Sequence, residues 1–129
     1  MRIICYENSG GFRLTIKLKR IYEKRALEDG KRIFVERLWP RGCTKEDAKI
    51  DEWLKDVAPS STLRKWYSHD QSKWIEFKTK YWSELKNEDA VIKKLKDESS
   101  KGTVTFLYAS KEEKLNSAAA LKEYIERMK

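Results

Sequence analysis

One run of seven residues, TVTFLYA at positions 103–109, constrains the fold more than any other part of the chain. After Thr105 nearly every residue of this run is apolar. A strand of this kind usually lies in the middle of a parallel sheet, where helices cover both of its faces. The run therefore predicts a buried central strand, and with it an α/β fold.

Two further strands are predicted earlier in the chain. Residues 14–19 (LTIKLK) alternate between apolar and polar, which is typical of a half-buried strand at or near a sheet edge. A loop around residues 28–30 then leads to a second strand at residues 32–37. Residues 2–6 also favour a short strand, but the NSGG sequence at residues 8–11 interrupts it. We therefore interpret residues 1–13 as an appended segment and residues 14–129 as the domain.

The region between the second and third strands has helical patterns in at least three pieces. Thr44 predicts the start of the first helix, because its hydroxyl can cap the helix while the side chain of Asp47, three residues later, makes the reciprocal capping contact. We expect helical character to continue through residues 51–57 and to end before Pro59. Four further helices are expected. A short one runs through Leu63 and Trp66 and is capped by Ser60 or Ser61, and the next has the aromatic face Trp74, Phe77 and Tyr81 and is capped by Asp70. Val91, Ile92 and Leu95 mark a third helix, and Ala118, Leu121 and Ile125 mark the last, which is capped by Asn116 or Ser117.

This order of elements predicts a single small α/β domain with a short, mostly parallel central sheet of about three to four strands flanked by helices. If the second and third strands run parallel, the segments 39–42 and 108–111 open on the same edge of the sheet. Ligands of open α/β sheets bind at such an edge. We therefore expect these two segments to form one cleft.

Charge and cysteine content narrow the classes of partner. The chain has 29 Lys and Arg residues against 21 Asp and Glu, a formal net charge of +8, which favours phosphates, nucleic acid or acidic surfaces. Cys5 and Cys43 form no C-x-x-C pair, and the single histidine, His69, adds too few ligands for an ordinary zinc site. We expect no metal and no cofactor. The chain has neither a run of the roughly 20 apolar residues that a membrane helix needs nor a secretion signal, which predicts a cytoplasmic protein without a membrane partner.

Several separated motifs carry a resemblance to a known family. They are ERLWPRG at residues 36–42, WLKDVAPS at 53–60, LRKWYSHD at 63–70, FLYASK at 106–111, and Asn116 with Ala118 and Leu121. In this order they resemble the YeaO-like family of small uncharacterised bacterial and archaeal proteins, from about residue 14 to the C-terminus. The resemblance implies a shared domain of unknown function and supplies no established reaction.

The chain departs from that family pattern at three positions. Cys43 stands where the family favours an aliphatic residue, so a nucleophilic thiol would not be a family property. Leu115 stands where relatives often carry a histidine beside the asparagine, which argues against a mechanism that needs a second imidazole. Glu36 replaces what is commonly an aspartate and keeps the charge.

The segment RLWPRG at residues 37–42 is the first candidate for a site. Arg37 and Arg41 can grip a phosphate or carboxylate, because each guanidinium offers paired donors, and Gly42 allows close approach of the backbone. The alternative is that both arginines pair with nearby carboxylates and hold the loop against its helix. Trp39 can stack on a planar ligand, or it can pack in the core.

Four other residues complete the predicted cleft. His69 is a candidate for proton transfer, because histidine is the residue type whose unperturbed pKa suits it near neutrality, against the alternative of a surface histidine. Tyr108 and Lys111 leave the third strand and can bind an anion, against ordinary polarity at a strand end. Asn116 is first a helix cap and second a ligand contact. We predict a small anionic ligand in this cleft, and the residues do not determine whether it is turned over.

A second hypothesis is a nucleic-acid-binding module. The basic stretch at residues 13–25 includes Lys17, Lys19, Arg20, Lys24 and Arg25, which could lie along a phosphate backbone. Lysines on an edge strand also guard against strand pairing between molecules, and the aromatic residues fall at helical core spacing elsewhere. A purely structural or partner-binding module is the third interpretation.

Overall fold

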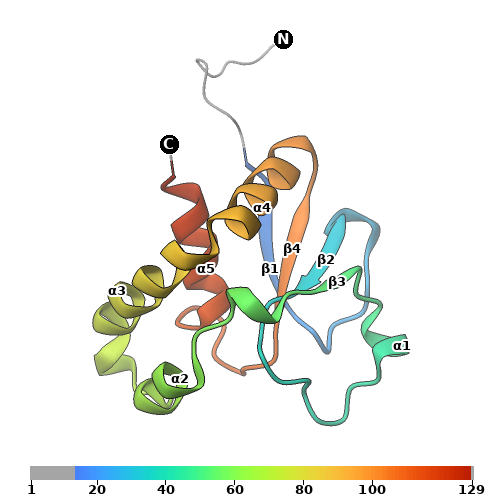
Figure 1. Ribbon diagram of the computed structural model, residues 1–129. Coiled ribbons are helices and arrows are strands. Elements are labelled where there is room, and N and C mark those ends of the chain that lie inside the picture. The colour runs from blue at the N-terminus through green and yellow to red at the C-terminus, as the bar shows by residue number, and fades with distance from the viewer. Residues whose placement is uncertain (1–13, 129) are drawn as a thin grey trace.

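A computed structural model describes residues 14–128 of the chain (Figure 1), so the expected strand at residues 2–6 and the appended segment lie outside the described residues. Four parallel strands form one sheet in the order β1-β4-β2-β3. Their bounds are β1 Ile16–Arg20, β2 Lys31–Phe34, β3 Glu52–Trp53 and β4 Val104–Tyr108. The predicted α/β class with a short parallel sheet is confirmed.

The apolar run forms the inner strand β4, as predicted. All five of its residues are buried, and it pairs with β1 on one side and with β2 on the other. Phe106 lies opposite Leu18 of β1 and Ile33 of β2. The alternating strand β1 lies at the sheet edge, which is also as predicted.

The helical expectation for residues 51–57 is wrong. Glu52 and Trp53 form β3 beside Ile33 and Phe34 of β2, and a 3-10 turn, η3 (Lys55–Val57), follows. The N–H of Leu54 continues the pairing by donating to the carbonyl of Phe34 at 2.9 Å. Pairing with a strand nearly twenty residues earlier overrides a local helical pattern here, because strand formation depends on the neighbouring strand more than on propensity.

Five α-helices and three further 3-10 turns complete the described chain. The helices are α1 Lys45–Ala48, α2 Ser61–Tyr67, α3 Trp74–Leu85, α4 Asp89–Lys101 and α5 Ser117–Glu126. The turns are η2 Leu27–Asp29, η4 Gln71–Lys73 and η5 Lys86–Glu88. Three predicted caps are present, and the fourth, Asp70, caps a short turn before the predicted helix and not the helix itself. Thr44 accepts from the N–H of Asp47, and Ser60 and Asn116 cap α2 and α5 in the same way. Asp70 caps η4, which leads into α3. No helix within residues 14–128 is both long enough and apolar enough to cross a membrane.

Helices α3, α4 and α5 gather on one side of the sheet, and α1 lies on the other (Figure 1). The larger core lies on the first side and includes Phe77, Tyr81 and Leu121. A smaller core on the second side is built from Ile21, Phe34, Ala48 and Leu107, with Trp39 and Trp53 packed against it. The smaller core therefore holds the loop that follows β2, through Trp39.

Candidate functional site

A cavity of about 600 Å³ lies beyond the carboxyl ends of β2 and β4. Its walls are residues 36–41 after β2, residues 109–110 after β4, residues 58–59, the second half of α2, and residues 115–117 at the start of α5. Because β2 and β4 are parallel neighbours, the chain segments that follow them meet at one edge.

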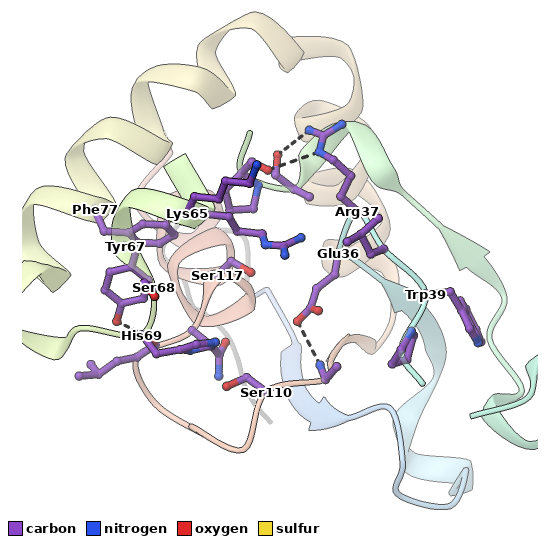
Figure 2. A pocket seen from close by; sticks show the side chains of 18 of the residues that line it. Glu36, Arg37, Trp39, Lys65, Tyr67, Ser68, His69, Phe77, Ser110 and Ser117 are labelled. Carbon is purple, nitrogen blue, oxygen red and sulfur yellow. Dashed lines mark hydrogen bonds between the residues drawn. The ribbon is translucent and has the colours of Figure 1, made fainter. Parts of the chain in front are cut away.

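Glu36 is the first residue beyond β2 whose side chain lines the cavity. Its Oε2 accepts from the N–H of Ala109 at 3.0 Å, which links the ends of β2 and β4 (Figure 2). Its backbone carbonyl accepts from the indole N–H of Trp53 at 2.7 Å. Burial raises the pKa of Glu36 above its ordinary value, although the N–H of Ala109 and the positive charges of Arg64 and His69 act in the opposite direction.

Arg37 lines the same cavity, but its guanidinium is occupied. Nη2 donates to the carbonyl of Ala58 at 3.3 Å, and Nε donates to the carbonyl of Pro59 at 3.5 Å (Figure 2). These contacts join residues 36–41 to the segment before α2. The observed contacts favour the structural interpretation of Arg37 over a ligand contact.

Four other basic side chains line the cavity: Arg41, Arg64, Lys65 and His69. All four residues are exposed, and among residues 14–128 none of them forms an ion pair with a carboxylate. Arg64 and Lys65 come from α2, while Arg41 comes from the loop after β2. The cavity thus brings two of the predicted residues together with two that were not predicted.

An unusual backbone turn places His69. Ser68 and His69 both have positive φ angles, 44° and 58°, in the left-handed region that residues with a side chain seldom adopt. Ser68 ends α2 by donating its N–H to the carbonyl of Arg64 at 3.0 Å. The turn sets the ring of His69 at 6.4 Å from the ring of Tyr67 (Figure 2).

Tyr67 connects α2 to the start of α5. Its buried ring stacks on Phe77 with 4.4 Å between the ring centroids, and its hydroxyl donates to the carbonyl of Leu115 at 3.0 Å. Burial raises the pKa of Tyr67, with smaller contributions from nearby carboxylates. The aromatic wall of the cavity is therefore held in place on both sides.

Asn116 lies at the cavity wall with its polar atoms already bonded. Oδ1 accepts from the N–H of Ala119 at 2.9 Å, and Nδ2 donates to the carbonyl of Glu112 at 2.7 Å. Its structural task as the cap of α5 is therefore clear. First-turn N–H groups have no partner within a helix, and this cap satisfies one of those of α5.

Lys111 and Tyr108 do not line the main cavity. Lys111 lines a second cavity of about 390 Å³, which shares Tyr67, His69, Ser110 and Leu115 with the first. Tyr108 is buried within β4 and belongs to the larger core.

Trp39 lines the main cavity and also packs in the smaller core. Its ring meets Phe34 and Trp53 edge-on, with 5.3 Å between centroids in both cases, and its indole N–H donates to the carbonyl of Cys43 at 2.6 Å. These contacts account for Trp39 as an anchor of the loop after β2.

The basic stretch near β1 is largely occupied by contacts within the domain. Lys17 donates to the carbonyl of Glu28, Lys19 to the carboxylate of Asp29 and the carbonyl of Lys24, and Arg20 to the carbonyls of Ala109 and Ser110. The side chains of Lys24 and Arg25 are exposed. Because Ala109 and Ser110 line the main cavity, the bonds from Arg20 support the wall of that cavity.

Sequence reasoning missed Glu36, Arg64 and Lys65 as lining residues, although all three stand in motifs that it singled out. Glu36 lies at the start of the segment that leaves β2, the position where α/β sites form. Arg64 precedes Ser68 by four residues, so helical spacing places the two on one face. Within residues 14–128, no cluster of three or more His, Cys, Asp or Glu side chains could hold a metal ion.

Comparison with known proteins places the chain among uncharacterised relatives. It is similar to the uncharacterised protein YeaO of Escherichia coli (strain K12), at 37% identity over 112 residues, 87% of this chain and 97% of that protein. It is 34% identical over 110 residues to the uncharacterised proteins Mb3100c of Mycobacterium bovis and Rv3073c of Mycobacterium tuberculosis, over 85% of this chain and 92% of each relative. No solved structure is significantly similar. Residues 15–128 match the family described as the inactive DUF488-N3 subclade, and the chain belongs to this YeaO-like family of unknown function.

Proposed function

We propose that the protein binds a small anionic ligand, with a phosphate or carboxylate group, in the main cavity. The observation that carries this proposal is the set of cations there without carboxylate partners among residues 14–128: Arg41, Arg64, Lys65 and His69. Some basic side chains elsewhere in the domain are paired with carboxylates. Lys31, for example, contacts both Glu52 and Glu98.

The position and composition of the cavity support the same proposal. It lies beyond the carboxyl ends of parallel strands, where α/β proteins bind their ligands. Four Lys and Arg side chains face one carboxylate, that of Glu36. A guanidinium matches the geometry of phosphate and carboxylate with two parallel donors. The first turn of α5 adds a positive helix end at the same wall.

The proposal is one of binding without turnover. The family description contains the word inactive, which supports a role that does not include a reaction. The strained turn at Ser68 and His69 serves a binding site equally well, because backbone strain also occurs at ligand clamps.

The nucleic-acid hypothesis has weaker support. Three of its five basic residues, Lys17, Lys19 and Arg20, already donate to groups of the same domain. Binding of a phosphate backbone to this stretch would then depend on Lys24 and Arg25. A salt titration of binding to short DNA and RNA tests this alternative, because phosphate-driven binding weakens steeply with salt.

Calorimetry at low salt tests the proposed site. The probes are inorganic phosphate, pyrophosphate and citrate, and the variants are Arg64→Gln and Arg25→Gln. Losing one charge-assisted contact should weaken binding in Arg64→Gln by about tenfold or more. Arg25→Gln removes the same charge from an exposed residue outside the cavity and should bind as the unchanged protein does.

Two results would contradict the proposal. One is that no anion binds in the millimolar range. The other is that Arg25→Gln weakens binding as much as Arg64→Gln, since binding would then follow the overall charge of the protein. Thermal unfolding of each variant, without ligand, checks that the substitutions leave the fold intact.

A further inference from the structure

Glu36 carries the wrong charge for a site that binds only a simple anion. Its carboxylate lines the same cavity as Arg41, Arg64 and His69. A phosphate or carboxylate placed among these cations would be repelled by Glu36, since like charges in one site raise each other's energy. The site therefore needs a ligand that satisfies both kinds of group.

One oxygen of the Glu36 carboxylate is also available to accept a hydrogen bond. Oε2 accepts from the N–H of Ala109, while Oε1 accepts no hydrogen bond from any residue between 14 and 128. Glu84 differs, because both of its oxygens accept from Ser60, at 2.9 and 2.7 Å. Glu36 is half-buried, so its carboxylate has lost part of its hydration, and burial raises its pKa. A ligand donor would restore what this oxygen has lost.

We propose, on the basis of the anion site described above, that the natural ligand is an anion whose body also carries a hydroxyl or amino group. The anionic group faces Arg41, Arg64 and His69, and the hydroxyl or amino group donates to Oε1 of Glu36. The ligand class is that of hydroxy acids, amino acids and the phosphate esters of polyols or amino alcohols. Glu36 selects among anions by the donor that they present.

The size and walls of the cavity favour such a body. About 600 Å³ is within the range of small-molecule sites and far exceeds the volume of a phosphate ion. Apolar and aromatic surface from Leu38, Pro40, Tyr67 and Phe77 lines the same cavity as the charged groups. A ligand with several carbon atoms can contact this surface while its two polar ends reach Glu36 and the cations.

Matched probe pairs test the inference by calorimetry on the full chain. Each pair shares its anionic group and carbon skeleton and differs in the donor: glycerol 3-phosphate against propyl phosphate, phosphoethanolamine against ethyl phosphate, and glycerate against propionate. We expect the donor-bearing member of at least one pair to bind about tenfold more tightly, as one hydrogen bond to a charged acceptor implies. The pairs separate hydroxyl from amino donors and phosphate from carboxylate anions.

Glu36→Gln should remove this preference. The amide oxygen can keep the contact with the N–H of Ala109, which turns the amide NH₂ toward the cavity. The ammonium of phosphoethanolamine then meets a donor, and a hydroxyl loses its charged acceptor and can only accept a weaker bond from a neutral amide, so the two members of a pair should bind within about threefold of each other. Glu113→Gln is the matched control, because Glu113 is exposed and outside both cavities, and it should keep the preference.

The outcomes distinguish this inference from the proposed function. If inorganic phosphate and every probe fail to bind, both are refuted. If anions bind but no pair shows a preference in the unchanged protein, only the selection by Glu36 is refuted. A preference that persists in a folded Glu36→Gln variant also refutes it, and the comparison of pairs in the unchanged protein stands even if that variant does not fold.

Discussion

Replacing Asp29 by Asn should destabilise the domain strongly, because Asp29 neutralises the fully buried Arg32. Nη1 of Arg32 lies 2.8 Å from Oδ2 of Asp29, and both side chains are almost completely excluded from solvent. The remaining guanidinium donors reach the carbonyls of Ala48 and Glu23. In Asp29→Asn the guanidinium keeps its charge and loses its counterion.

The expected loss follows from the cost of an uncompensated buried charge. Breaking a buried pair by removing one partner costs about 3–5 kcal/mol. An asparagine oxygen can still accept one hydrogen bond, so we expect about 3 kcal/mol, which corresponds to a fall of roughly 10 °C in Tm for a chain of this size. The matched control is Asp97→Asn, which removes an exposed pair with Lys101 on α4 and should cost less than about 0.5 kcal/mol.

Urea unfolding measures both losses and the coupling between the two residues. The double variant Asp29→Asn with Arg32→Met should be at least about 1 kcal/mol more stable than the sum of the single losses implies, because it also removes the stranded charge. The reasoning fails if Asp29→Asn unfolds like Asp97→Asn. It also fails if the losses of the two single variants simply add.

The same carboxylate should make stability depend on pH. Burial alone would raise the pKa of Asp29, but the N–H of Ala26 together with Lys19 and Arg32 brings it below its ordinary value. A lowered pKa contributes stability above the ordinary pKa of Asp, and this contribution is lost as the pH falls below about 4. The stability difference between the unchanged protein and Asp29→Asn should therefore narrow from pH 7 to pH 3. A constant difference would contradict the assignment.

Urea unfolding also tests two further substitutions, each of which should lower the free energy of unfolding. Tyr81→Phe should cost about 1–3 kcal/mol, because the fully buried carbonyl of Val57 loses its donor, and a neutral result would mean that another group replaces the hydroxyl. Gly30→Ala should destabilise by more than about 1 kcal/mol, since φ is 61° and the new Cβ would collide with the carbonyl of Thr103. Gly102→Ala meets nothing within 4 Å and should not be destabilising, so equal losses at the two glycines would contradict the steric argument.

Much of the fold could be predicted because its signals are local. The apolar run at 103–109 contains the inner strand β4, and the alternating run at 14–19 overlaps the edge strand β1. Thr44, Ser60 and Asn116 cap helices by contacts that span three residues. Such contacts depend on residues within one turn, so a single stretch of sequence contains all that is needed. The strand β3 was missed because its two residues become a strand only by pairing with β2.

The candidate site was predicted only in outline. The meeting of the segments after β2 and β4 follows from parallel strands and could be expected in advance. The roles of single residues could not. Arg37 was predicted as a ligand contact, yet it donates to the carbonyls of Ala58 and Pro59, whereas Arg64, which was not predicted as one, lines the cavity without an ion pair among residues 14–128.

The sequence by itself determined the α/β class, the inner strand, most of the helix caps and the edge of the sheet where the main cavity lies. Only the tertiary structure decided which cations are already occupied and that the carboxylate of Glu36 lies in their midst. The physical reason is one of range. Hydrophobic periodicity and capping act between near neighbours in the chain, while the partner of a charged side chain is whichever distant segment packs beside it.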